Sequence, residues 1–156
     1  MAESRDHNQF KLITPERINQ GDVGEDVTLS CHLSPETSAV TMIIMWFKET
    51  ECIYLYKNGQ VTERRGYEGR LSLITQEMER GNVFLRMKNI KETDGGRYIC
   101  QVIHGEQKEE ALVGLRVSLG KLSIITVHDC KHLNNNTNQC LSLYNTHILY
   151  HVGRRS

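Results

Sequence analysis

The chain has 156 residues, 38% of them hydrophobic, which suits one core domain with residues left over. Its 19 basic residues balance its 19 acidic ones, so no overall field favours nucleic acid or a charged membrane surface as a partner. The longest apolar stretch, residues 42–47, is far too short to span a bilayer.

Short runs of alternating apolar and polar residues, separated by turn residues, predict strands through the first 118 residues. The runs are 10–13, 26–33, 42–48, 53–57, 70–73, 83–88, 97–104 and 110–118. Asn58-Gly59, after the fourth run, is the strongest hairpin signal in the chain. No helical period competes with these runs, so the sequence predicts an all-β fold of two packed sheets.

The strand pattern stops at Leu119, and the remaining residues are rich in Asn, Thr and His. We therefore expect an N-terminal extension at 1–9, one domain at 10–118 and an irregular or disordered tail at 119–156. Gly120-Lys121 follows the domain at once, and in-frame reading of a common splice donor encodes this pair. One hypothesis is that the tail is translated intron, and a spliced transcript carrying the tail as an exon would contradict it.

Four residues form a spaced framework: Cys31, then Trp46, then Tyr98 two residues before Cys100. This framework resembles that of a variable-type immunoglobulin sandwich. The resemblance implies a two-sheet Greek-key fold with one disulfide between the sheets, from Cys31 to Cys100. It also implies that Trp46 packs on the bridge and that Tyr98 hydrogen-bonds the corner before its strand.

Further motifs place the resemblance within one branch of these domains. Residues 10–118 resemble the butyrophilin and myelin-oligodendrocyte-glycoprotein branch, which is related to the co-stimulatory ligands of T cells. The motifs that carry this resemblance are Val23–Cys31, Leu33-Ser34-Pro35, Trp46-Phe47, Leu55-Tyr56-Lys57-Asn58-Gly59, Tyr67-Glu68-Gly69-Arg70, Gly81–Met87 and Asp94-Gly95-Gly96-Arg97-Tyr98-Ile99-Cys100. The last strand lacks the Phe-Gly-x-Gly bulge, which argues against a rearranged antigen-receptor domain.

The cysteines indicate the cellular compartment in which the domain folds. A structural disulfide needs an oxidising environment, whereas the first eight residues are polar and do not form a signal peptide. We expect an extracellular domain on the external side of the plasma membrane, and the chain is then a mature segment or one that lacks its leader. Cys130 and Cys140 are candidates for a second, short disulfide loop, and Cys52 is either a free thiol or an intermolecular bridge.

Two charged residues are expected to be structural. The resemblance implies that Arg70 and Asp94 form the ion pair that closes one end of such domains. An arginine and a carboxylate can pair through two parallel hydrogen bonds, and removing either member would leave an uncompensated charge.

Alternation along two strands predicts a binding face. If Trp46 points into the core, then the side chains one residue away from it point outward, and Cys100 orients its own strand in the same way. With Leu55 taken as inward, Tyr54 and Tyr56 would join the outward set. The predicted partner-binding face is Ile43, Met45, Phe47, Tyr54, Tyr56, Ile99, Gln101 and Ile103, with the loop His104–Gln107 at its rim. Large apolar patches seldom face water without a partner.

Other chemistry has little support in the sequence. Asn135-Asn136-Thr137 is an acceptor pattern for N-linked sugar in the tail. The tail's His and Cys residues lack the spacing of a zinc site, so no metal and no cofactor are expected. No nucleophile with a nearby base is suggested, so we expect no enzyme and no small-molecule substrate.

The sequence therefore favours a non-enzymatic recognition module. The leading interpretation is a cell-surface domain that binds another cell-surface receptor or ligand through one sheet face and regulates immune cells through T-cell co-signalling. One alternative is a homophilic adhesion module, in which the same face forms a homodimer. Another is a soluble splice product that acts as a decoy.

Overall fold

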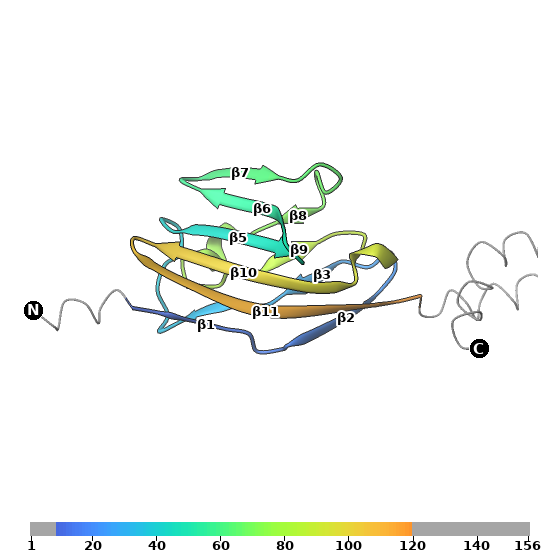
Figure 1. Ribbon diagram of the computed structural model, residues 1–156, viewed down its shortest axis with the longest axis horizontal. Coiled ribbons are helices and arrows are strands. Elements are labelled where there is room, and N and C mark those ends of the chain that lie inside the picture. The colour runs from blue at the N-terminus through green and yellow to red at the C-terminus, as the bar shows by residue number, and fades with distance from the viewer. Residues whose placement is uncertain (1–8, 120–156) are drawn as a thin grey trace, which may run out of the picture. The chain divides into compact units, whose positions relative to one another are not determined.

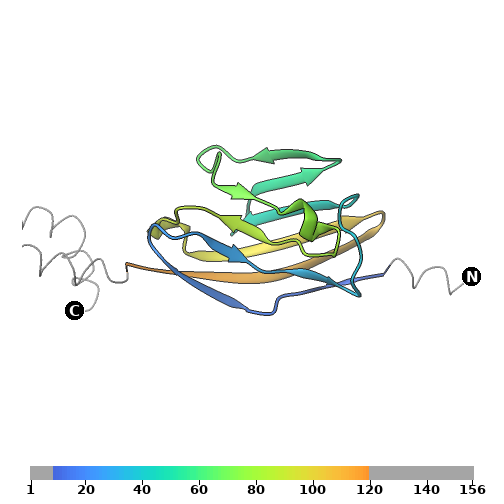
Figure 2. The same ribbon diagram turned by 180° about the vertical axis from the view of Figure 1, so that it is seen from behind.

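The computed structural model describes residues 9–119, which fold into two β-layers packed face to face (Figures 1 and 2). The larger sheet has six strands, in the order β2 (Ile18–Asp22), β11 (Gln107–Ser118), β10 (Gly96–His104), β5 (Ile43–Lys48), β6 (Glu51–Lys57) and β7 (Gln60–Glu63). Facing it are a three-stranded sheet of β3 (Val27–Leu29), β9 (Leu85–Met87) and β8 (Leu71–Ser72), and a two-stranded sheet of β1 (Lys11–Ile13) and β4 (His32–Ser34). The predicted all-β sandwich is confirmed, with one short helix, α2 (Thr75–Met78), and one 3-10 turn, η1 (Glu92–Asp94), among the described residues.

The N-terminal segment crosses between the two layers. β1 pairs with β4, whereas β2 lies beside β11 in the larger sheet. Between them the chain turns at Thr14–Arg17, where Pro15 cannot donate a ladder hydrogen bond. The sequence predicted β1 but not β2, because Ile18–Asp22 carries a polar residue at most positions and ends on Gly21-Asp22.

The predicted strand at 26–33 appears as two pieces, β3 and β4. Between them, the Cys31 carbonyl still accepts a hydrogen bond from the Val83 amide in the neighbouring segment of the same layer, at 2.9 Å. A bridge between His32 and Asn82 continues the same pairing. The two pieces therefore act as one strand that holds Cys31 in the core.

The core is built around Trp46, with Cys31 and Cys100 beside it, all three fully buried. The side chains of Cys31 and Cys100 lie in contact with each other. The disulfide between them stays a prediction. Cys130, Cys140 and Asn135, the candidates for a second disulfide and a sugar site, lie outside the described residues.

The predicted Asn58-Gly59 hairpin is confirmed as the connection between β6 and β7. Lys57 pairs with Gln60, so the loop has two residues. Both loop residues have positive φ, 53° at Asn58 and 75° at Gly59, as the turn favoured by right-twisted hairpins requires.

Arg70 and Asp94 form a two-pronged ion pair at one end of the sandwich. The guanidinium nitrogens donate to the two carboxylate oxygens at 2.8 and 3.1 Å. The Lys91 amide donates to the same carboxylate at 2.7 Å, and the Asp94 side chain is only 3% exposed. Tyr98, the predicted corner tyrosine, donates its hydroxyl hydrogen to the Asp94 carbonyl. Asp94 therefore joins the turn η1, the loop at Arg70 and the strand β10.

Replacing Arg70 with alanine should cost about 3 kcal/mol of unfolding free energy, because the buried Asp94 carboxylate would lose its countercharge. Urea denaturation measures the loss. Arg64→Ala is the matched control, since the Arg64–Glu51 pair at 3.3 Å is roughly half exposed and should be worth at most about 1 kcal/mol. Equal losses in the two variants would contradict the structural role given to Arg70.

The same pair should appear in the pH dependence of stability. Burial opposes ionisation of Asp94, but the hydrogen bonds from Arg70 and the Lys91 amide outweigh it and lower the pKa of this carboxyl. Its contribution is then complete above the ordinary aspartate pKa of about 3.9 and is lost as the pH falls through the lowered value. Asp94→Asn should remove this part of the acid sensitivity, as urea denaturation at several pH values between about 2 and 5 would measure.

Candidate functional site

The orientation of the larger sheet is set by one row of residues across its three central strands. Cys100 lies opposite Trp46, and Trp46 lies opposite Tyr54. All three side chains are buried against the second layer. Because successive side chains of a strand point to opposite faces, their neighbours along each strand belong to the other, outer face.

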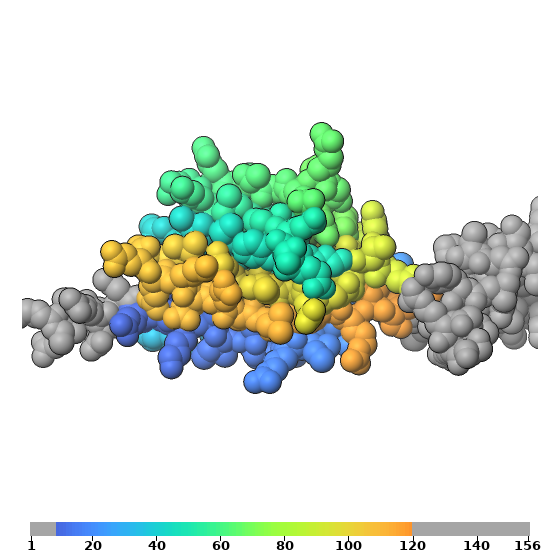
Figure 3. All heavy atoms as spheres, in the orientation of Figure 1, coloured from blue at the N-terminus to red at the C-terminus, as the bar shows by residue number. Residues whose placement is uncertain are grey.

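The outer sheet face is the group of apolar side chains on that outer side. Within it, Leu112, Ile99 and Phe47 form one row of facing residues, and Gln101, Met45 and Leu55 form the next. Ile103 faces Ile43 in a third row. The apolar members are Ile43, Met45, Phe47, Leu55, Ile99, Ile103 and Leu112, each at least partly exposed. Figure 3 views the molecule from this side, with β10 and β11 lying across its front below β5 and β6.

A polar pair lies in the middle of these apolar rows. Gln101 is only 8% exposed, although its strand position is on the outer side. Its side-chain amide donates to the Glu110 carboxylate at 2.6 Å, and Lys108 lies 3.7 Å from the same carboxylate. Gln101 is thus held in one orientation, and the exposed Glu110 places a negative charge beside the apolar rows.

Tyr54 and Tyr56 are not part of the outer sheet face, contrary to the sequence prediction. They are 4% and 7% exposed and point into the core. The Tyr56 hydroxyl donates to the Val40 carbonyl at 2.9 Å. The assumption that Leu55 points inward was wrong, because the register places Leu55 opposite Met45, an outward residue.

An irregularity in β6 explains why alternation misled here. Trp46 pairs with Tyr54, but the next residue, Phe47, pairs with Cys52, so Ile53 is an extra residue in the strand. Ile53 and Tyr54 are consequently both buried. A strand with such an insertion cannot be oriented by counting from its sequence alone.

Leu55, Cys52 and Leu112 belong to this side of the sheet and were missing from the predicted set. Leu112 is 56% exposed, and alternation against its buried neighbour Val113 could have found it. Cys52 lies opposite Phe47, and burial raises the pKa of its thiol. The Cys52 thiol also donates to the Tyr54 carbonyl, with 3.5 Å between sulfur and oxygen.

The predicted rim loop is the tight turn between β10 and β11. His104 pairs with Gln107, and Gly105 has a positive φ of 63°. The Gln107 side chain donates to the Phe10 carbonyl at 2.7 Å, which ties the turn to the start of the domain. The turn is therefore a fixed edge of the outer sheet face.

Residues 9–119 contain no group of three His, Cys, Asp or Glu side chains placed to hold a metal ion. Over the same residues no helix is long and apolar enough to cross a membrane.

Comparison with known proteins places this geometry in a family. The model of the immunoglobulin V-set domain matches residues 14–118. Butyrophilin subfamily 1 member A1 from Bos taurus is 36% identical over 72% of this chain and 22% of its own length. Butyrophilin subfamily 2 member A2 from Homo sapiens is 34% identical over 76% of this chain and 24% of its own length. The chain therefore spans about a quarter of the length of these relatives.

Two solved structures are similar to this domain, and one of them is also a butyrophilin. The crystal structure of bovine butyrophilin superposes with a TM-score of 0.66 at 37% identity, covering 69% of this chain and 54% of that one. The human B7-H4 IgV-like domain superposes with a TM-score of 0.61 at 27% identity, covering 69% of this chain and 96% of that one.

Replacing Tyr56 with phenylalanine should lower the unfolding free energy by about 1 kcal/mol, because the Val40 carbonyl loses its partner. Binding through the outer sheet face should be unaffected, since the side chain points the other way. Chemical denaturation gives the first quantity, and affinity for a partner of the face gives the second. If the variant is as stable as the unchanged protein but binds the partner more weakly, Tyr56 belongs to the outer sheet face and the inward assignment is wrong.

Proposed function

The chain belongs to the immunoglobulin V-set family, with relatives among the butyrophilins and myelin-oligodendrocyte glycoprotein, and from this we propose that it is a non-enzymatic cell-surface recognition domain. It binds another cell-surface protein through the outer sheet face. Its setting is immune-cell regulation, including T-cell co-signalling. In this proposal the domain works on the external side of the plasma membrane.

One observation carries the proposal: seven apolar side chains gather on a single face of the sheet, Leu112 exposed and the other six partly exposed. Leu112, Ile99 and Phe47 adjoin one another across three strands, as do Met45 and Leu55 across two. Apolar patches of this kind on a monomer mark interaction sites. Aromatic and methionine side chains are also enriched among interface anchors.

The polar pair gives such a face a means of discrimination. Gln101 and Glu110 hold each other at 2.6 Å in the middle of the apolar rows. Gln101 and Lys108 both approach the same oxygen of the Glu110 carboxylate, so a partner that covers Glu110 must supply a donor to the other oxygen, because burying it unpaired is costly. Apolar contact then supplies affinity, and the Glu110 carboxylate rejects partners that lack a matching donor.

The immune setting is supported by the likeness of this domain to bovine butyrophilin and to the human B7-H4 IgV-like domain, whose structures both superpose on it. The homophilic alternative uses the same face and differs only in its partner, which is then a second copy of the chain. It is distinguished by a dimer whose population rises with protein concentration.

A binding screen of the full chain against a panel of displayed cell-surface proteins tests the proposal. Met45→Asp and Phe47→Asp should each weaken a specific interaction by roughly tenfold or more, because each places a charge among the apolar rows. Val61→Asp is the matched control: Val61 is 49% exposed and lies on β7, away from the central strands.

Two outcomes would contradict the proposal. One is a partner whose affinity is unchanged in both face variants. The other is equal weakening in Val61→Asp, which would indicate that an added charge acts on the whole domain. A concentration-dependent dimer that Phe47→Asp abolishes would instead select the homophilic function.

A further inference from the structure

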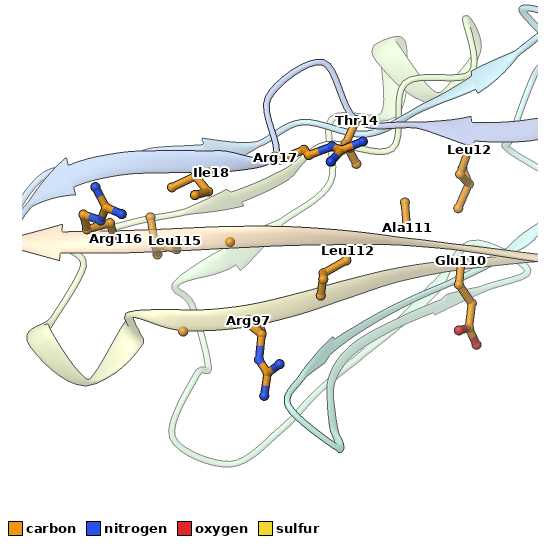
Figure 4. A pocket seen from close by; sticks show the side chains of 12 residues that line it. Leu12, Thr14, Arg17, Ile18, Arg97, Glu110, Ala111, Leu112, Leu115 and Arg116 are labelled. Carbon is orange, nitrogen blue, oxygen red and sulfur yellow. The ribbon is translucent and has the colours of Figure 1, made fainter.

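A groove lies along the edge of β11, beside the segment that crosses from β1 to β2, and shares Glu110 and Leu112 with the border of the outer sheet face. It has a volume of about 710 Å³. Leu12, Thr14, Arg17 and Ile18 line it from the crossing segment, and Ala111 and Leu112 line it from β11 (Figure 4). The groove is thus bounded on one side by the edge of a long strand.

Part of that strand edge has no neighbouring strand. The Gly114 amide donates to the Arg17 carbonyl at 2.7 Å, so the main-chain groups of Gly114 point toward the crossing segment. In an antiparallel ladder, residues two apart point their main-chain groups the same way. The amide and carbonyl groups of Lys108, Glu110 and Leu112 therefore also point outward. Figure 1 shows β2 running parallel to β11, so β2, which follows Arg17, lies beside the part of β11 that follows Gly114. In residues 9–119 β1 does not pair with Lys108, Glu110 and Leu112 either, because it pairs with β4.

The groove offers apolar surface as well as main-chain groups. Ile18 is 54% exposed and Leu112 is 56% exposed, which makes them two of the most exposed large apolar side chains of the described chain. Both line the groove, Ile18 from the start of β2 and Leu112 from β11. An extended segment could bury both of them while it pairs with the strand edge.

The groove is lined by more basic than acidic side chains, which favours an acidic ligand. Arg17, Arg97 and Arg116 line it, against Glu110 as its one acidic residue. Glu110 already accepts a hydrogen bond from Gln101 and lies near Lys108. Arg97 has an exposed pairing with Glu49 at 3.7 Å, whereas Arg17 and Arg116 have no acidic partner within 4 Å among residues 9–119.

We propose that this groove binds an extended segment of a partner protein in which acidic and aliphatic side chains alternate. The segment adds a strand to β11 through the main-chain groups of Lys108, Glu110 and Leu112. Strand addition of this kind draws affinity from main-chain hydrogen bonds and specificity from alternate side chains. The aliphatic side chains contact Ile18 and Leu112, and the carboxylates pair with Arg17 and Arg116.

The same charges disfavour two other occupants. A second copy of this chain would bring one set of groove arginines against another. The chain's own residues 120–156 contain Lys121, Lys131, Arg154 and Arg155 but only Asp129 as an acid, so they do not complement the groove. The partner is therefore expected to be a different protein.

The probe for this proposal is an acetylated and amidated eight-residue peptide in which aspartate alternates with valine, carrying a fluorophore. Anisotropy with the full chain measures its affinity, and amide NMR shifts of the full chain locate it. We expect shifts at Lys108, Glu110 and Leu112. We also expect loss of binding when alternate peptide amides are methylated, because the methyl groups block strand pairing.

Charge reversal provides the second arm. The double variant Arg17→Glu with Arg116→Glu should lower the affinity for the peptide by about tenfold. Exchanging the peptide's aspartates for lysines should lower the affinity by a similar factor. Arg65→Glu is the matched control, since Arg65 is exposed and lies away from the groove; it should leave the affinity within about twofold. Met45→Asp should also leave it unchanged, since Met45 does not line the groove, and this result separates the groove from the centre of the outer sheet face.

Three results would overturn the proposal. The first is equal affinity for the lysine peptide. The second is a set of shifts centred on Ile43, Met45 and Phe47 instead of the β11 edge. The third is a dimer of the full chain that disappears in the arginine double variant, which would assign the groove to a second copy.

Discussion

The row of Cys100, Trp46 and Tyr54 across the three central strands is the constraint on which the rest of the structure depends. These side chains are buried against the second layer, and the period of two in a strand then decides the direction of every neighbour. A shift of one residue in any of these strands would exchange its core and surface sets. The same row that builds the core therefore also creates the outer sheet face.

The domain separates its polar interactions from its apolar ones. Arg70, Asp94 and Tyr98 hold one end of the sandwich through hydrogen bonds around the buried Asp94. On the outer side, Gln101 and Glu110 form a small polar centre among apolar rows. The β11 edge differs from both, because it combines unpaired main-chain groups with arginines. In the two proposals, the outer sheet face and the β11 edge therefore bind protein partners of different chemistry.

The sequence predicted the structure correctly at positions where the residue types present are compatible with only one local conformation or one known framework. Asn58-Gly59 predicted its hairpin because both positions need positive φ, and the Cys31, Trp46 and Cys100 framework predicted the sandwich. It failed at β6, where the extra residue Ile53 turns Tyr54 and Tyr56 inward and Leu55 outward. Insertions of this kind depend on pairing with another strand, and no local pattern records them. The β11 edge was also missed, because it results from where β1 and β2 pair.

The central claim is that strand register directs Met45 outward and its neighbours in the chain inward. Methionine oxidation by dilute hydrogen peroxide, followed residue by residue with peptide mass spectrometry, tests it most directly, because exposure governs the rate. Met45 is partly exposed, whereas Met42, Met78 and Met87 are at most 2% exposed. We predict that Met45 oxidises fastest of these four and that a bound partner of the face slows it. Met42 oxidising as fast as Met45, or Met45 as slowly as Met87, would contradict the account.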